Sequence, residues 1–92
     1  MANYFVSYDL NGPTPSHAQM DKHMEKAGWT RGRVLETVWY VGATQTLKEV
    51  FAYVDSILTG NDRLIVIEAK DAHMRNLLIT NESLQENWPV YK

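Results

Sequence analysis

One carboxylate, Asp9, stands where a strand must stop and a turn begins. In residues 4–10, six of the seven residues suit a pleated strand and the seventh is Asp9, and the turn signal Asn11-Gly12-Pro13 follows at once. A strand-terminal acid beside a turn is placed where it can act on a ligand. It can also serve the turn itself, by accepting the backbone amide of Asn11 or Gly12. The sequence therefore leaves a functional and a structural role open for Asp9.

Two arginines, Arg31 and Arg33, flank Gly32 at the entrance to a second β-rich segment. Paired guanidinium groups can hold a phosphate through charge-assisted hydrogen bonds, which makes these residues the candidate nucleic-acid-binding positions of the chain. Exposed arginines beside a glycine also occur simply because they keep a protein soluble. Both interpretations of the pair stay open at this point.

Histidine and cysteine chemistry contributes little here. His17 and His23 are six residues apart and point to different sides of an expected helix, and His73 has no metal-site spacing to either. The sequence contains no cysteine, which excludes disulfides, thiolate metal ligands and cysteine nucleophiles. No glycine-rich phosphate loop is present, and no serine, histidine and acid arrangement can be argued.

Composition predicts one small cytoplasmic domain. The chain has 92 residues, of which 45% are apolar and 22% charged, as in globular proteins. Its net charge of −2 argues against a general attraction to nucleic acid, so any such binding needs a local basic patch. No apolar run approaches the ~20 residues of a membrane helix, and the start lacks a signal peptide's pattern. We therefore expect a cytoplasmic protein with no membrane association.

The first strand divides its side chains between two environments. Period-two alternation places Tyr4, Val6, Tyr8 and Leu10 on one face and Phe5, Ser7 and Asp9 on the other. We expect the first set to pack under helices. The second set is semi-polar and is therefore available to a partner.

Two helices are expected. Thr14-Pro15 predicts an N-cap followed by proline at the first helical position, and Gly28 fits the left-handed residue that ends a helix, which gives a helix over residues 15–27. The segment Thr46-Leu47-Lys48-Glu49 is a capping box that begins a second helix. An apolar stripe follows it and must cover a sheet: Leu47, Val50, Phe51, Val54, Ile57 and Leu58.

The remaining β-rich segments carry unresolved alternatives. Residues 34–41 form either one long strand or, with a bend near the middle, two short strands that pair as a hairpin with residues 29–33 or 42–44. Residues 63–70 are apolar on both faces in their centre. That segment is either a central strand covered on both sides or a strand at a dimer contact.

This order of elements predicts an α+β fold of the ferredoxin-like split β-α-β type. We expect one antiparallel sheet with two helices on one face, in a single domain over residues 1–92 whose core is residues 1–70. The uncovered face is expected to bind a second copy, which gives a two-fold homodimer. The large apolar residues of segment 71–92 are expected to pack on the sheet or on the partner.

Several segments together resemble one family. The first strand with Asp9, the run Leu35-Glu36-Thr37-Val38-Trp39, the capped helix after it and Asn61-Asp62-Arg63-Leu64-Ile65-Val66 look like the small CRISPR-associated adaptation subunits. They also resemble the stand-alone relatives of these subunits, the SinR-like and virulence-associated protein D groups, and the likeness is greatest to the SinR-like branch. It extends over about three quarters of the chain, residues 2–70.

The resemblance implies a ferredoxin-like homodimer with an endonuclease function. In that family an aspartate that ends the first strand lies near the two-fold axis and serves as a magnesium ligand for cleavage of RNA or DNA. Only Asp9 matches this position, so the resemblance implies Asp9 as the catalytic and metal-binding residue and Mg²⁺ as the cofactor. Many members of the family instead hold DNA as scaffolds without cleaving it.

Two functions follow from the sequence and both stay open. The first is a dimeric relative of the CRISPR adaptation nucleases, active in antiviral defence, that binds or cleaves RNA or DNA with Mg²⁺. The second is a protein-interaction factor without catalysis, such as a toxin-module, mobile-element or anti-defence protein, that engages a protein partner. The low positive charge of the chain favours the second function.

Overall fold

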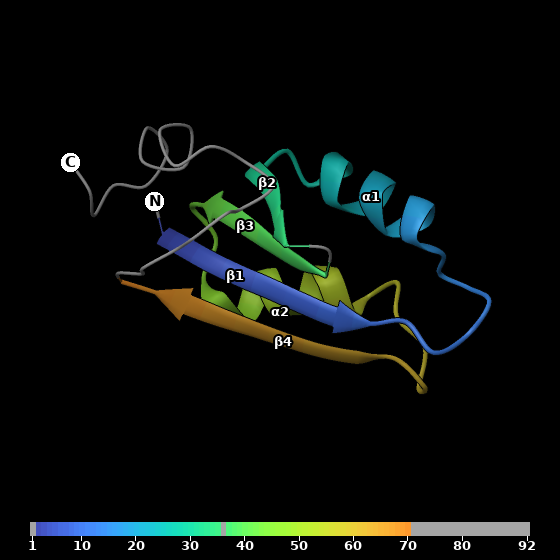
Figure 1. Cartoon of the computed structure of the whole chain (residues 1–92). Coiled ribbons are helices and arrows are strands. Elements are labelled where there is room, and N and C mark those ends of the chain that lie inside the picture. Colours follow the sequence, from blue (N-terminus) through green and yellow to red (C-terminus); the bar gives the residue numbers. More distant parts are fainter. Residues whose placement is uncertain (1, 36, 71–92) are drawn as a thin grey trace.

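Residues 2–35 and 37–70 are described by a computed structural model, in which four strands form one sheet accompanied by two helices (Figure 1). In chain order the elements are β1 (Ala2–Asp9), α1 (His17–Lys26), β2 (Thr30–Leu35), β3 (Val38–Ala43), α2 (Leu47–Asp55) and β4 (Arg63–Ala69). The strands lie in the order β2-β3-β1-β4, and each neighbouring pair is antiparallel. The predicted α+β class with one antiparallel sheet is confirmed. The predicted extension over residues 71–92 lies outside the described residues.

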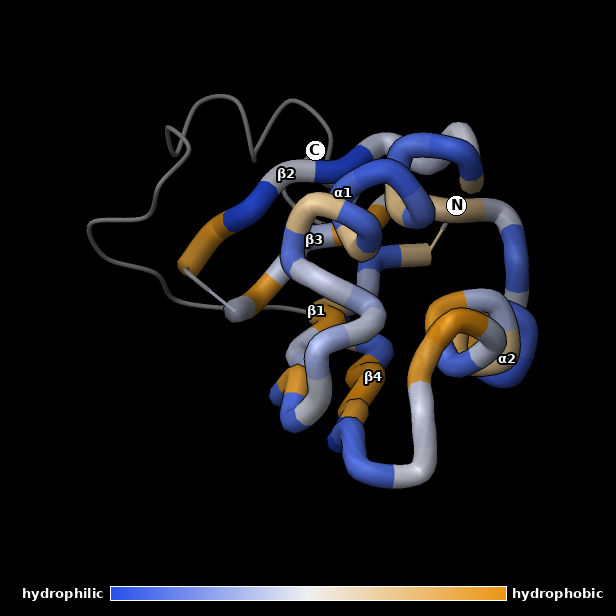
Figure 2. Tube along the Cα trace, turned by 90° about the vertical axis from the view of Figure 1, so that its right-hand side faces the viewer, coloured by the Kyte–Doolittle hydropathy of each residue, from blue (hydrophilic) through white to orange (hydrophobic). Residues whose placement is uncertain are grey.

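The alternation of β1 separates the two faces of the sheet, as the sequence predicts. One side of the strand packs with both helices, in a buried cluster that includes Tyr4, Val6, Tyr8, Met20, Met24, Val50 and Val54. Figure 1 shows α2 behind β1 and β3, and in the turned view of Figure 2 it lies beside the strands. We call this the helix-covered face. Phe5, Ser7 and Asp9 alternate with the buried set and lie on what we call the second face.

Residues 30–35 and 38–43 form the two strands of a hairpin. Of the two predicted alternatives, two short paired strands are therefore correct and one long strand is wrong. β2 and β3 pair antiparallel, with Thr30 opposite Gly42 and Leu35 opposite Val38. Thr37 lies in the turn between the strands. The register shifts between Arg33 and Leu35, as at a β-bulge.

The start of α1 differs from the prediction. The N-cap is Ser16 rather than Thr14, because the Ser16 hydroxyl accepts the Gln19 amide at 3.2 Å and the Gln19 side chain accepts the Ser16 amide at 2.7 Å. This capping box fixes the first turn two residues later than the proline signal suggested. At the other end, Gly28 adopts a φ of 72°, which confirms the predicted left-handed residue after the helix.

The predicted capping box of α2 is confirmed, but its apolar stripe is only partly buried. Thr46 and Glu49 exchange hydrogen bonds of 2.9 and 3.2 Å. Val50 and Val54 are fully buried, whereas Leu47 and Phe51 are 39% and 42% exposed. Neither helix in the described ranges has the length and apolar character needed to cross a bilayer.

The prediction that β4 is a central strand covered on both sides is wrong. The strand pairs only with β1 and forms an edge of the four-stranded sheet. Leu64 and Val66 pack against the core, while Ile65 and Ile67 are 55% and 50% exposed. The alternative, in which this strand lies at a contact with a second copy, stays a prediction.

Side-chain hydrogen bonds connect large buried residues on the helix-covered face. The indole Nε1 of Trp39 donates to the hydroxyl of Tyr8 at 2.9 Å, and the hydroxyl of Tyr4 donates to the carbonyl of Gln45 at 2.6 Å. Burial raises the pKa of both tyrosine hydroxyls. These bonds join β1 to β3 and to the loop before α2, so the polar tips of Tyr4, Tyr8 and Trp39 are hydrogen-bonded within the protein.

A clasp built on Asp62 ties the end of β1 to the start of β4. One carboxylate oxygen accepts the backbone amide of Asn11 at 2.9 Å, and the other accepts the Thr59 amide at 2.8 Å. The Asn11 side chain donates in addition to the carbonyl of Asn61 at 2.8 Å. The amide bonds from Thr59 and Asn11 lower the pKa of Asp62 below its ordinary value of 3.8.

This clasp predicts a pH-dependent stability. Because the folded pKa of Asp62 is depressed, its contribution is fully present above the ordinary value of 3.8 and is lost as the pH falls through the folded value. In urea unfolding, an Asp62→Ala variant is expected to be less stable than wild type at about pH 6, and the difference should shrink below about pH 3.5.

The matched control is Asn11→Ala, which removes the bond to Asn61 but keeps the backbone amide that reaches Asp62. It should retain the wild-type loss of stability with falling pH. A difference between wild type and Asp62→Ala that stays constant across this pH range would contradict the assigned role of the carboxylate.

Candidate functional site

Asp9 is the last residue of β1 and is exposed on the second face. In register it lies opposite Arg63 at the start of β4. Within residues 2–35 and 37–70 its side chain makes no hydrogen bond or ion pair. The structural alternative, a cap on its own turn, is not observed: the Asn11 amide donates to Asp62, and no bond from the Gly12 amide to Asp9 is present among the described residues. Asp9 is therefore a carboxylate whose oxygens are available to a ligand.

The surroundings of Asp9 on the second face are largely apolar. Cross-strand pairing aligns one row from Ile65 through Ser7 and Val38 to Leu35, and a neighbouring row from Ile67 through Phe5 to Tyr40. The two ends of the first row are exposed, with Ile65 at 55% and Leu35 at 49%. Tyr40 is buried, and its hydroxyl donates to the Asn3 side chain at 2.9 Å.

Arg33 is already engaged by groups of its own chain. Its Nη2 donates to Asp21 Oδ1 on α1 at 2.6 Å, and its guanidinium carbon lies 5.0 Å from the centroid of the Trp39 ring. The Nε atom is buried without a hydrogen-bond acceptor among the described residues. These contacts hold Arg33 between the edge strand and α1, where it links two layers of the fold.

The predicted arginine pair does not converge on Asp9. In register Arg31 lies opposite Val41 and Arg33 opposite Trp39, two residues of the buried cluster under the helices. Both arginines therefore belong to the helix-covered side of β2, and Asp9 lies on the other side of the sheet. Arg31 is exposed, so of the two it is the cation that remains accessible to a phosphate.

His23 forms a structural contact between the helices, which the sequence did not reveal. Its ring stacks on the Tyr53 ring at 4.1 Å with an angle of 7° between the planes. Its Nε2 donates to the Tyr53 carbonyl at 2.6 Å, and the Tyr53 hydroxyl donates back to the His23 carbonyl at 2.7 Å. Over the described part of the chain, no group of three or more histidines and carboxylates gathers as a metal site.

Comparison with known proteins gives no family assignment. No model of a protein family, no curated protein and no solved structure matches this chain. The chain's own geometry offers three features that bear on function. They are one available carboxylate on the second face, exposed aliphatic residues near it, and an arginine pair of which one member is engaged.

The contact between Arg33 and Asp21 can be measured by a double-mutant cycle. The two side chains are 35% and 46% exposed, so solvent screens their attraction. Using Asp21→Ala, Arg33→Ala and the double variant, we expect a coupling free energy of about 0.5 to 1 kcal/mol in urea unfolding.

The matched control is the pair Asp21→Ala and Arg31→Ala. It combines the same carboxylate with the arginine for which no bond to Asp21 is present among the described residues. Its coupling should be close to zero. A coupling for Arg33 that is no larger than the coupling for Arg31 would refute the specific role of Arg33.

Proposed function

We propose that this chain is a self-associating interaction protein whose second face binds another copy of itself. The observation that carries this proposal is the exposure of Ile65 and Ile67, which place two large aliphatic side chains side by side on one face of an edge strand. Both are about half exposed although their strand is well paired with β1. Aliphatic residues gathered in this way are typical of protein interfaces.

The arrangement of the second face suits a copy of itself. The row that starts at Ile65 on one edge of the sheet ends at Leu35 on the other, so exposed aliphatic residues stand at both ends. A two-fold axis parallel to the strands reverses this row and sets Ile65 of one copy over Leu35 of the other. Sheets packed in this manner lie about 10 Å apart, with their side chains interdigitating.

The topology supports a ferredoxin-like fold for each copy. The elements follow in the chain order β1, α1, β2, β3, α2, β4, and the strands lie in the sheet order β2-β3-β1-β4. This is the arrangement of a split β-α-β unit, in which β3 lies between β1 and β2. With both helices on the same face, such a sheet leaves its other face for an interface.

A second candidate function, Mg²⁺-dependent binding or cleavage of RNA or DNA, is favoured by Asp9. Its exposed carboxylate has no partner among the described residues, and carboxylate oxygen is the ligand type that Mg²⁺ prefers. The two-fold axis described above places both Asp9 side chains at the same end of the interface, where they would hold one ion. A bound Mg²⁺ would supply activation of water toward a phosphodiester.

Charge favours the interaction function over the nuclease. A nucleic acid needs cations along its phosphates, but the chain carries a net charge of −2 and Arg33 is occupied by Asp21. Asp9 also supplies a single carboxylate for each copy, so a metal site with two carboxylates needs two copies. Dimerisation is therefore required by both functions. Metal binding is an additional step, which can fail while the dimer still forms.

The dimer interface is tested by the double variant Ile65→Lys and Ile67→Lys. In the proposed dimer these lysines would lie against the aliphatic residues at the β2 edge of the other copy and lose their water without a charged partner, so we expect a loss of dimer affinity of about 100-fold or more. Both positions are half exposed in the single copy, and the midpoint of unfolding at low protein concentration should change little. Analytical ultracentrifugation across a concentration series measures the effect.

The matched control is Phe51→Lys, which alters a residue of α2 that is 42% exposed, on the side of the molecule away from the second face. This variant should remain dimeric. Wild-type protein that sediments as one copy at all concentrations, or a dimer that survives the double substitution, would rule out the proposed interface.

Metal binding is tested by titrating Mg²⁺ into wild type and Asp9→Asn while following heat and the cleavage of single-stranded RNA and DNA. If the second candidate function holds, one Mg²⁺ binds per dimer, and the variant loses both the binding heat and any cleavage because its amide carries no charge. The control Asp55→Asn, on the exposed end of α2, should behave as wild type. A dimer that binds no Mg²⁺ would leave the interaction function as the sole candidate.

A further inference from the structure

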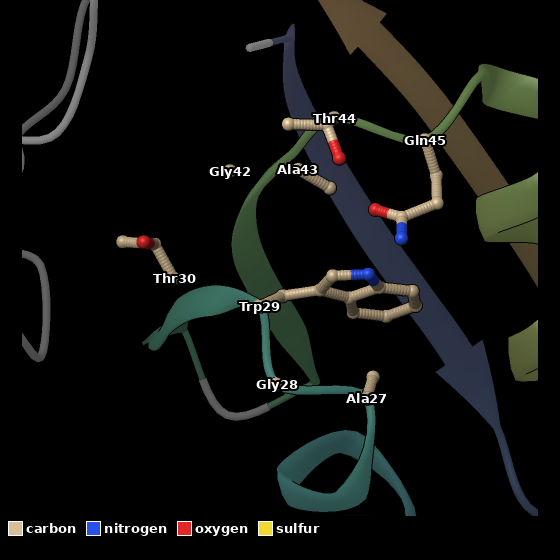
Figure 3. A pocket seen from close by; sticks show the side chains of 8 residues that line it. All are labelled: Ala27, Gly28, Trp29, Thr30, Gly42, Ala43, Thr44 and Gln45. Atoms are coloured by element: carbon tan, nitrogen blue, oxygen red, sulfur yellow. The ribbon is translucent and has the colours of Figure 1, made fainter.

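A hollow of about 210 Å³ opens between the α1–β2 turn and the β3–α2 loop, away from Asp9 (Figure 3). Gly42 and Ala43 of β3 line it, together with Trp29, Thr44 and Gln45. The hollow is distinct from the site on the second face, since Trp29 and Ala43 both belong to the cluster under the helices.

Trp29 brings an unpaired hydrogen-bond donor to this hollow. Its side chain is only 8% exposed and its ring meets the Tyr53 ring edge-on, with centroids 5.2 Å apart. Figure 3 shows the indole nitrogen on the edge of the ring that faces Gln45. Nowhere in residues 2–35 and 37–70 does this nitrogen have an acceptor, whereas the Trp39 indole donates to Tyr8. A nearly buried N–H that faces a hollow is available to an acceptor from outside the chain.

Gln45 supplies the complementary groups. Its backbone carbonyl accepts the Tyr4 hydroxyl at 2.6 Å, which anchors the loop to the core. Its side-chain amide, in contrast, makes no hydrogen bond with the described residues and projects toward the hollow in Figure 3. That amide offers one acceptor and two donor positions beside the fixed donor of Trp29.

The lining also defines the charge and size of a ligand. No charged side chain is among the described residues that line the hollow, so a neutral molecule is favoured over an ion. The volume is below the usual range for drug-sized ligands, which indicates a molecule of about one ring. The mixed character of the Gln45 amide requires a ligand edge with both an acceptor and a donor.

We propose that this hollow binds a small neutral molecule that presents a planar lactam edge, a C=O group next to an N–H group. The carbonyl accepts the indole N–H of Trp29, and the adjacent N–H donates to the side-chain oxygen of Gln45. Thr44 also lines the hollow. This site is independent of the dimer interface and of Asp9.

The test is a titration of the full chain with uracil, a neutral single-ring lactam, followed by ¹⁵N–¹H correlation spectra. The chain has three tryptophans, and Trp29→Phe assigns the indole signal of Trp29. We expect a saturable shift of that signal at millimolar uracil, with the indole signal of Trp39 unchanged. No saturable shift of the Trp29 indole up to the solubility limit of uracil would overturn the proposal.

Two comparisons test the hydrogen-bonding scheme. Gln45→Ala should weaken uracil binding about 5- to 10-fold, the effect of one hydrogen bond. 1,3-Dimethyluracil, which keeps the carbonyls but has no N–H, should bind wild type more weakly by a similar factor. Asp55→Asn, which lies outside the hollow, serves as the control and should keep wild-type affinity.

Equal affinity of wild type and Gln45→Ala for uracil would overturn the scheme, as would equal binding of uracil and its dimethyl derivative. If Trp29→Phe does not fold, the Gln45→Ala variant still decides the question, because its backbone carbonyl keeps the bond to Tyr4. In that case the Trp29 signal is assigned from its proximity to the Tyr53 ring in through-space spectra.

Discussion

The structure depends on the burial of one side of β1 beneath both helices. Tyr4, Val6 and Tyr8 are almost completely enclosed, and the packing of α1 and α2 on that side commits the alternate residues to the second face. A slip of the strand by one residue would expose the tyrosines and bury Asp9, whose charge has no partner among the residues that the structure describes. The alternation therefore determines at once where the core lies and which residues are offered to a ligand or a second copy.

The two edge strands of the sheet, β2 and β4, carry different kinds of side chain. On β2, Arg33 reaches α1 and the Trp39 ring, so this edge is joined to the helix layer by a cation. On β4, the residues away from the core are the aliphatic Ile65 and Ile67, and they are about half exposed. An edge strand of this kind pairs or packs readily with another chain unless a charge interrupts it. In the proposed dimer Ile65 of one copy lies over Leu35 of the other, so both edges of the second face take part, while the Arg33 cation stays on the helix-covered side.

Local signals in the sequence predicted most of the fold. The faces of β1, the capping box at Thr46 and the left-handed Gly28 all follow from near neighbours along the chain. The start of α1 was misplaced because Ser16 and Gln19 formed a capping box that the proline signal obscured. The position of β4 at an edge depends on which strands pair, a long-range property that alternation cannot reveal.

The same distinction applies to the site residues. Asp9 could be predicted because a strand-terminal acid is visible in the sequence, but the engagement of Arg33 by Asp21 depends on the packing of a helix across the sheet. The hollow beside Trp29 was missed for the same reason, although an aromatic residue directly after a helix-ending glycine is a signal that could have drawn attention to it. The reciprocal bonds between His23 and Tyr53 connect α1 to α2. The Tyr53 ring also packs edge-on against the Trp29 ring. A ligand bound beside Trp29 would therefore contact a ring that is held by both helices, and selectivity there would come from the shape of the ligand and not from movement of the protein.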